Sequence, residues 1–250
     1  MHFLPGSPGR CSVKKVQQHY DEVADIYDDR YDGSRGKYYH GHISDHVMSM
    51  LPKGGFLLDL GCGTGLFVQR YVEEGGRAFG LDISPGMVRH GRRRCPECGF
   101  CVGTADVLPF RDATFDALAS LLAFSYVPDP EAMLRECYRV LKPGGRIAVC
   151  TLSRTVFTSI VPIIYLMGEK IGLKKVGVGD FDEHYYTNAE ITGLFRDAGF
   201  EDISVGRCSF AHLNLADPIF KLARKVEPFV EENLPYLAYN VCAAGKKPED

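Results

Sequence analysis

The stretch "FLLDLGCGTGLF", residues 56–67, contains residue types at a spacing that suits the binding of a small molecule. An apolar run typical of a buried strand includes Asp59 near its end, and Gly61, Gly63 and Gly65 follow before the sequence turns apolar again. Glycines between a strand and a helix let the backbone approach a ligand closely, as in phosphate and dinucleotide sites. The stretch therefore predicts a ligand site at the end of a strand.

The spacing of the glycines argues against a phosphate ligand. The dinucleotide fingerprint GxGxxG needs a third glycine where Leu66 stands here, and Asp59 places a carboxylate where a pyrophosphate needs positive potential. A P-loop is excluded because no GK[ST] follows the glycines. The loop therefore favours a ligand that carries positive charge at this point.

A second acid narrows the choice of ligand. Asp82 ends the next strand-like run, about 20 residues after the first glycine, where α/β nucleotide sites place a carboxylate on ribose hydroxyls. A ribose and a cation without phosphate describe S-adenosylmethionine, which consists of adenosine, a sulfonium and an amino-acid tail.

The elements that must position these residues follow a regular alternation. Short apolar runs alternate with helical patterns that carry clear caps, such as Ser84, Asp129 and the Thr187–Glu190 capping box. The strands are predicted at residues 56–60, 77–83, 100–106, 115–124, 146–152, 201–210 and 236–247. Such alternation predicts an α/β fold with a doubly wound, mostly parallel sheet, and the two strands after the last capped helix predict an antiparallel edge.

The whole chain, residues 1–250, is predicted to be one domain with four parts. An aromatic stripe over 13–31 and a helical pattern over 41–51 predict an N-terminal helical cap over 13–51. The other parts are a cofactor-binding core, an apolar helical insertion and a C-terminal completion of the sheet. Their ranges are 54–152, 153–182 and 183–250.

Composition excludes several classes of function. A net charge of -3 leaves no excess of basic residues for nucleic acid, and the basic run 89–95 is interpreted as a solvated helix face. Without a long apolar span or a signal sequence, a cytoplasmic location is expected. The cysteines are expected to be buried thiols, and Cys95, Cys98 and Cys101 are interpreted as incidental thiols on a turn, with no metal.

Five segments, in order and at the same spacing, carry a resemblance to a known family: "LLDLGCGTG", "GLDIS", "GTADVLPF", "FDALAS" and "RVLKPGGR". On these segments the chain resembles the class I S-adenosylmethionine-dependent methyltransferases, in the group that includes the ubiquinone and menaquinone biosynthesis methyltransferases. The resemblance is close over Val16 to Leu152 and looser beyond. It implies a seven-stranded, Rossmann-like sheet and S-adenosylmethionine as cofactor.

The resemblance also implies roles for residues at the methionine end of the cofactor. The backbone of Gly61, Cys62 and Gly63 passes under the methionine moiety, and Asp59 lies near its amino group. Leu121 supplies a backbone carbonyl to the same end.

At the adenosine end, the resemblance implies that Asp82 holds the ribose hydroxyls and that Ile83 and Met87 lie against the adenine. Asp106 accepts from the adenine amino group and the N–H of Val107 meets a ring nitrogen. Helix packing is the alternative for Met87, and a simple cap is the alternative for Asp106.

Tyr20 and Tyr27 are expected to reach the cofactor's carboxylate from the N-terminal helix, with plain packing as the alternative. Methyl transfer is an in-line displacement, so a general base is needed only if the acceptor must lose a proton. His184 is the predicted base, with a surface role as its alternative, and Tyr126 and Tyr185 are weaker candidates.

The acceptor is expected to be a small, hydrophobic, quinone-like or lipid-like molecule. The chain has no [DN]PPY motif of adenine methylation and no Pro-Cys pair of cytosine methylation. The resemblance implies that the apolar segment 153–182 roofs the acceptor pocket, and a homodimer interface or simple packing are open alternatives. Two other functions are weighed: a nucleotide-dependent oxidoreductase, which Asp59 and Leu66 disfavour, and a non-catalytic S-adenosylmethionine-binding subunit or sensor.

Overall fold

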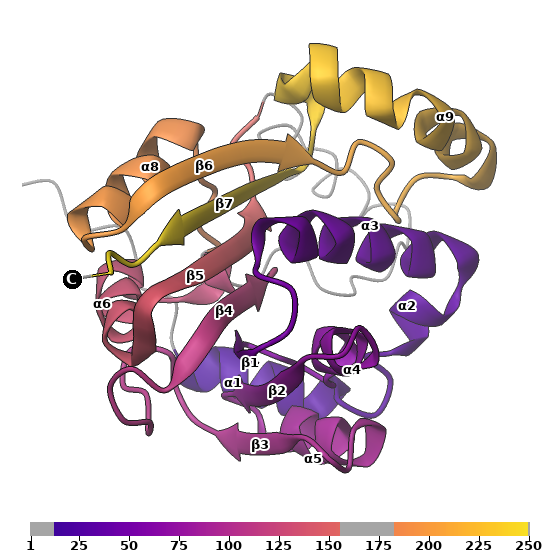
Figure 1. Ribbon diagram of the computed structural model, residues 1–250. Helices are drawn as coiled ribbons and strands as arrows, with labels where there is room; N and C mark the ends of the chain where they lie inside the picture. Colours follow the sequence, from indigo (N-terminus) through magenta and orange to yellow (C-terminus); the bar gives the residue numbers. More distant parts are fainter. Residues whose placement is uncertain (1–12, 156–182, 250) are drawn as a thin grey trace, which may run out of the picture.

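Seven strands form a single mixed sheet in the computed structural model, which describes residues 13–155 and 183–249 (Figure 1). Their order across the sheet is β3-β2-β1-β4-β5-β7-β6. Strands β1 to β5 run parallel to one another, and β7 is antiparallel to both β5 and β6. The strands are β1 Phe56–Leu60, β2 Arg77–Asp82, β3 Gly99–Val102, β4 Phe115–Leu121, β5 Leu141–Leu152, β6 Glu201–Cys208 and β7 Asn240–Lys246.

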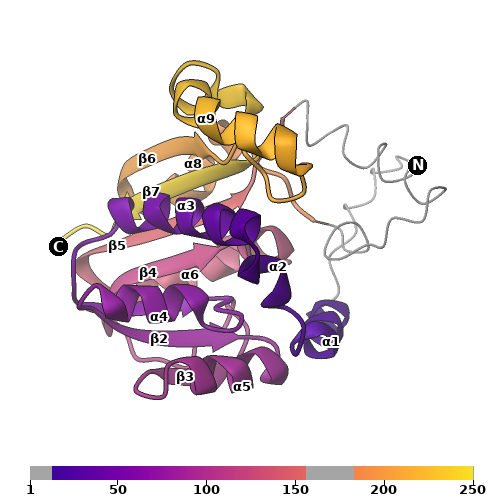
Figure 2. The ribbon, with the colours of Figure 1, turned by 90° about the vertical axis from the view of Figure 1, so that its right-hand side faces the viewer.

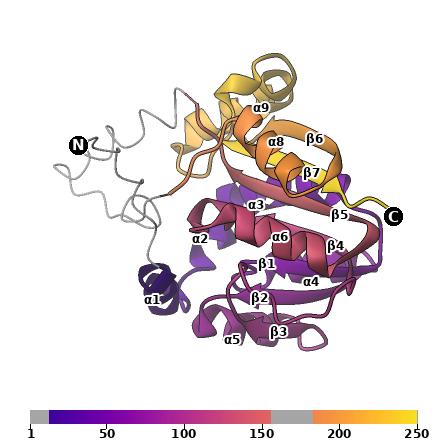
Figure 3. The same ribbon diagram turned by 90° about the vertical axis from the view of Figure 1, so that its left-hand side faces the viewer.

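Helices cover both faces of this sheet. Figure 2 shows α3 and α4 in front of one face, and Figure 3 shows α6 and α8 in front of the other. Each face buries its own apolar cluster against the strands. The helices are α1 Val13–Val23, α2 Asp29–Asp32, α3 Ser34–Met50, α4 Leu66–Glu73, α5 Pro85–Arg94, α6 Pro130–Val140, α8 Asn188–Asp197 and α9 Asp217–Asn233, with the short 3-10 helices η1 Phe124–Tyr126 and η3 Pro235–Leu237.

The predicted α/β class and the mostly parallel, Rossmann-like sheet with its antiparallel strand are confirmed. The antiparallel strand β7 is second from the edge, because β6 pairs along its outer side. The predicted helical insertion over 153–182 lies outside the described residues, apart from 153–155. None of the described helices is long and apolar enough to cross a bilayer.

The predicted caps set where helices begin. The Ser84 hydroxyl accepts the Met87 N–H at 3.0 Å, and the Asp129 carboxylate accepts the Ala132 N–H at 2.9 Å. The predicted capping box of Thr187 and Glu190 is also present. These caps satisfy backbone N–H groups that have no partner inside the helix, so each βα connection ends at a defined residue.

The N-terminal prediction needs correction. The aromatic stripe over 13–31 predicts one helix, but α1 ends at Val23, a turn follows, and α3 begins at Ser34 rather than at residue 41. Asp21 bonds to Ser84, and Asp28 bonds to Thr64 and Arg94. The turn between Asp21 and Asp28 lets both carboxylates reach these partners, so tertiary contacts override the helical pattern.

Candidate functional site

A cavity opens at the carboxyl ends of β1, β2 and β4, where parallel α/β sheets bind their ligands. Its volume is about 920 Å³, including its open mouth. A second, smaller pocket shares Tyr27, Gly61, Gly63, Leu121 and Leu122 with it. Together the two pockets are lined by most of the predicted cofactor residues, namely Tyr20, Tyr27, Asp59, Gly61, Cys62, Gly63, Asp82, Ile83, Met87, Asp106 and Leu121.

The glycine loop has the conformation that its sequence predicts. Gly61 and Gly63 have φ angles of +70° and +52°, which L side chains rarely adopt. The N–H groups of Gly61 and Cys62 both donate to the carbonyl of Leu81, at 2.8 and 3.1 Å. A Cβ on Gly61 would lie 2.2 Å from the Cβ of Ala123. Glycine is therefore required here both by the backbone angle and by the close approach of the β4–α6 loop.

Asp82 fixes this loop from the neighbouring strand. Its two carboxylate oxygens accept the N–H groups of Gly63 at 2.8 Å and Ser84 at 2.9 Å. The side chain is buried, and burial raises the pKa of Asp82 although the backbone N–H groups oppose that rise. Each carboxylate oxygen has further lone pairs, so Asp82 can accept additional donors from a ligand in the cavity that it lines.

Asp59 is a buried acid with an unused oxygen. Only 2% of the residue is exposed, and its Oδ1 has no hydrogen-bond partner among the described residues. Burial, together with the nearby charge of Asp82, raises the pKa of Asp59 to about 8. A buried acceptor without a partner is costly. A donor group of a ligand, best a cation, would remove this cost.

The charge of the cavity decides between ligand classes. Asp82 and Asp106 line it, and none of its described lining residues is Lys, Arg or His. A pyrophosphate placed here would meet carboxylates without a compensating cation. The geometry therefore suits a cationic ligand and disfavours the dinucleotide alternative.

Two features of the β4 end were missed by sequence reasoning. Leu122 has a φ of +60°, so β4 ends at Leu121 and not at residue 124 as predicted. The Leu122 N–H donates to the carbonyl of Cys150 at 2.7 Å, which holds this conformation. The Ser120 hydroxyl lines the cavity, is buried, and has no partner among the described residues. A residue other than glycine that adopts a left-handed backbone conformation, as Leu122 does, often marks a ligand site. No sequence pattern predicts such a residue.

The N-terminal segment closes one side of the cavity. Tyr20 and Tyr27 both line it, in an edge-to-face pair with ring centroids 6.1 Å apart. Burial raises the pKa of both phenols. Asp21 anchors the segment by accepting the Gly86 N–H at 2.9 Å at the start of α5, and Asp25 bonds to His90 at 2.9 Å. These two acids were not singled out in the sequence, although they position the tyrosines.

The basic run is a solvated helix face at Arg89, Arg92 and Arg93, which are exposed as predicted, but Arg94 is only partly exposed. Its guanidinium donates to the carbonyl of Thr64 at 2.9 Å and to the carboxylate of Asp28. It therefore ties the end of α5 to the glycine loop and to the N-terminal segment.

Two predicted site residues do not line the cavity. Val107 is 71% exposed, and His184 is exposed with its ring against Tyr186, 4.9 Å between centroids. The cavity is instead reached by Tyr126, whose hydroxyl donates to Glu183 Oε1 at 3.0 Å. Burial raises the pKa of Glu183. Sequence reasoning ranked Tyr126 below His184 and did not name Glu183.

The cysteine turn also differs from its prediction. Cys95 and Cys98 form a disulfide rather than two free thiols, since the turn brings their Cα atoms to 5.3 Å. Cys101 is a free, partly exposed cysteine of β3.

Comparison with protein families agrees with this geometry. A family model described as a methyltransferase domain matches residues 58–149, which contain the glycine loop, Asp82 and β1 to β5 up to Val149. The demethylmenaquinone methyltransferase of Streptomyces griseus is 39% identical over 102 residues, covering 41% of this chain and 44% of that protein. The ubiquinone biosynthesis O-methyltransferase of Xylella fastidiosa is 30% identical over 169 residues, covering 64% of this chain and 68% of that protein. The chain thus spans less than half the length of the first relative.

A solved structure with the same fold is a SAM-dependent methyltransferase of Thermotoga maritima. Its TM-score is 0.68, with 24% sequence identity, and the match covers 93% of this chain and 99% of that one. At this identity the likeness is one of fold alone. It extends beyond residues 58–149 to the elements on either side.

Proposed function

Because this chain belongs to the class I S-adenosylmethionine-dependent methyltransferases, of the group found in quinone biosynthesis, we propose that it transfers a methyl group to a small, hydrophobic molecule. One observation carries the proposal: the cavity at the carboxyl ends of β1, β2 and β4 is lined by Asp82 and Asp106 and by no Lys, Arg or His among the residues that the structure describes. S-adenosylmethionine, the cofactor of the family, brings a sulfonium and an ammonium group, which such a cavity favours.

The residues fit this cofactor at both ends. Asp59 offers to the ammonium group its Oδ1, which has no partner among the described residues, and the carboxylate of Asp82 is available to the ribose hydroxyls. The sulfonium supplies an activated methyl group, so the chain's task is to align the acceptor and exclude water. Tyr20 and Tyr27 contribute to both tasks from the N-terminal side of the cavity.

We infer that the acceptor is a hydroxylated aromatic ring with an apolar substituent. The names of both relatives point to quinone biosynthesis, one through a demethylmenaquinone and one through O-methylation. Apolar side chains also line the cavity, among them Val13, Val16, Val127, Pro128 and Met133. Loss of the hydroxyl proton makes both the oxygen and the ring carbons beside it more nucleophilic. The same class of acceptor can therefore be methylated on oxygen or on carbon.

Tyr126 and Glu183 can remove that proton. In this proposal the Tyr126 oxygen takes the proton of the acceptor hydroxyl while its own proton passes to Glu183, already its acceptor at 3.0 Å. A raised pKa brings a carboxylate closer to the range in which a base works near neutral pH. After this relay Tyr126 again carries one proton, Glu183 has gained one, and the acceptor has lost one.

Tyr126→Phe tests this relay. We expect turnover to fall about 100-fold or more, the usual contribution of general base catalysis, with S-adenosylmethionine affinity unchanged. Turnover should also fall as the pH drops below the raised pKa of Glu183, and Glu183→Gln should remove that dependence. Tyr185→Phe is the matched control, since its hydroxyl also bonds to Glu183, at 2.9 Å, but does not line the cavity. Equal losses in the two tyrosine variants would contradict the relay.

The raised pKa of Asp59 predicts a proton release on cofactor binding. At pH 6.5 the free protein holds Asp59 protonated, since its pKa is about 8. Pairing with the ammonium group, whose own pKa is about 7.7–8.0, ionises Asp59 and releases about one proton. Calorimetry in buffers of different ionisation enthalpy measures this number. Affinity should rise between pH 6 and pH 8.

Asp59→Asn is the control for that measurement and should release no proton. It should also remove a pH dependence of folding. The pKa of Asp59 is about 8 in the folded protein and about 3.9 in the unfolded chain. Asp59 therefore stabilises the folded state fully below about pH 3.9, and this stabilisation is lost as the pH rises through 8. Native-like proton release by Asp59→Asn would show that another group pairs with the ammonium.

Turnover assays decide between an enzyme and a non-catalytic S-adenosylmethionine-binding subunit. The protein is incubated with S-adenosylmethionine and hydroquinones that carry alkyl chains of increasing length, and S-adenosylhomocysteine and methylated product are measured together. Product that increases with chain length supports the proposed acceptor. Tight cofactor binding without product from any acceptor of this class would contradict it.

A further inference from the structure

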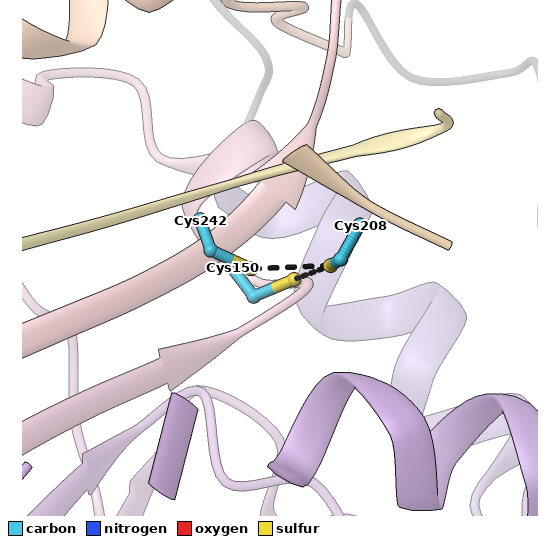
Figure 4. A group of neighbouring side chains, drawn as sticks. All are labelled: Cys150, Cys208 and Cys242. Atoms are coloured by element: carbon cyan, nitrogen blue, oxygen red, sulfur yellow. Dashed lines mark hydrogen bonds between the residues drawn. The ribbon is translucent and has the colours of Figure 1, made fainter. Parts of the chain in front are cut away.

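Three cysteines from three neighbouring strands meet in the core. Cys150 on β5 pairs directly with Cys242 on β7, and Cys208 lies on β6, beyond β7. Their exposed fractions are 0%, 1% and 0%. Figure 4 shows the three thiols pointing toward one another. The Sγ atoms of Cys208 and Cys150 are 4.0 Å apart, those of Cys208 and Cys242 are 3.2 Å apart, and all three lie within 4.8 Å of one another.

These separations match those around a single metal ion. Three sulfurs bound at about 2.3 Å lie about 3.8 Å apart at tetrahedral angles and about 4.0 Å apart in a plane. The Cys208–Cys150 distance of 4.0 Å already has this value. The Cys208 and Cys242 sulfurs would move apart by roughly 0.6 Å, which small side-chain rotations allow.

Polar groups lie next to Cys208 in the chain and around Glu231. The residue after Cys208 is Ser209, whose N–H donates to Glu231 Oε1 at 2.7 Å. The same carboxylate contacts His42 Nε2 at 2.7 Å and His46 Nε2 at 3.4 Å. These imidazole side chains are 21% and 33% exposed. These partly exposed imidazole and carboxylate groups are themselves possible metal ligands.

We propose that Cys150, Cys208 and Cys242 bind one soft metal ion, Zn²⁺ or Cu⁺, as three thiolates. Soft thiolate ligands favour these ions over Mg²⁺ or Ca²⁺. On binding, each S–H bond loses its proton to solvent and each sulfur forms a bond to the ion, so three protons leave for one ion bound. The bound ion ties β5, β7 and β6 together beside the Cys150 carbonyl that accepts the Leu122 N–H.

Cadmium is the probe for this site, because its thiolate charge-transfer absorption and its NMR shift report the number of bound sulfurs. The test uses the full chain with Cys95→Ser and Cys98→Ser. These changes remove a separate group that could bind Cd²⁺, because Cys95 and Cys98 lie close to the carboxylate of Glu97. Under reducing conditions we expect one equivalent of Cd²⁺ bound by three thiolates. Zn²⁺ and Cu⁺ should displace it in competition.

Cys208→Ser and Cys242→Ser are made in parallel and should each weaken Cd²⁺ binding at least about 100-fold, because each removes a direct ligand. Cys137→Ser is the matched control, since Cys137 is a free thiol with 0% exposure on α6 in the other apolar cluster. It should bind Cd²⁺ like the parent. Three results would each overturn the proposal: no Cd²⁺ bound by the parent, a signal from fewer than three sulfurs, or unchanged binding in both serine variants. A Cys208–Cys242 disulfide that persists under reduction would also overturn it.

Discussion

Asp82→Ala will weaken the binding of S-adenosylmethionine at least about 100-fold. The carboxylate is expected to accept both ribose hydroxyls, and each hydrogen bond to a charged acceptor contributes about 1.5–3 kcal/mol. The loss of two such bonds, about 3 kcal/mol or more, corresponds to at least about 100-fold in the dissociation constant. The change also removes the acceptor of the Gly63 N–H, so the glycine loop loses a contact that orders it. Calorimetric titration of the purified variant measures the effect.

Asp116→Ala is the matched control for this experiment. Asp116 is likewise a strand carboxylate that accepts a backbone N–H, that of Phe56 at 2.8 Å, but it lies near the start of β4, at the opposite end of the strand from the cavity. We expect Asp116→Ala to lower stability and to leave cofactor affinity within about twofold. If Asp82→Ala binds the cofactor as tightly as this control does, the assignment of Asp82 to the ribose is wrong.

Gly61→Ala will abolish measurable cofactor binding and lower the free energy of unfolding by about 2–5 kcal/mol. A φ of +70° costs an L residue about 1–2 kcal/mol, and overpacking adds about 1–3 kcal/mol. The overpacking arises because the new Cβ would lie 2.2 Å from the Ala123 Cβ. The loop must shift away from Ala123, which displaces the backbone expected under the methionine moiety. Thermal unfolding and calorimetric titration measure the two effects.

Gly75→Ala separates backbone strain from steric overlap. Gly75 has a φ of +91°, but a Cβ there would meet nothing within 4 Å. Its variant should lose stability through strain alone and keep cofactor affinity. Adding Ala123→Gly to Gly61→Ala should recover part of the lost stability, because it removes the overlap and leaves the strain. Normal binding by Gly61→Ala would contradict the expected role of this loop.

The folding pattern was predictable because it depends on local sequence. Ser84, Asp129 and Thr187 satisfy N–H groups within their own helix, so their effect is the same wherever the helix packs. Predictions failed where the backbone conformation depends on contacts with residues far away in the sequence. The helix expected over 13–31 breaks after Val23, and Leu122 adopts a left-handed conformation that a carbonyl on β5 holds in place.

The candidate site divides in the same way. The glycine spacing and the two acids after neighbouring strands were visible in the sequence, since parallel strands bring their carboxyl ends to one edge. The residues proposed for proton transfer were not visible in the sequence. His184 was preferred because it is a loop histidine before a capped helix, but the cavity is lined by Tyr126, whose hydroxyl bonds to Glu183. Residue type alone does not reveal which of several polar side chains faces inward.

The sequence by itself therefore determined the α/β class, the parallel core and a ligand with positive charge and a ribose, because each follows from spacing within a short stretch. Only the tertiary structure decided that an oxygen of Asp59 has no partner among the described residues, that Asp21 anchors the N-terminal segment, and that Cys150, Cys208 and Cys242 meet. Those features depend on the order of strands in the sheet and on which helices cover them. Segments far apart in the chain become neighbours only when the core is packed.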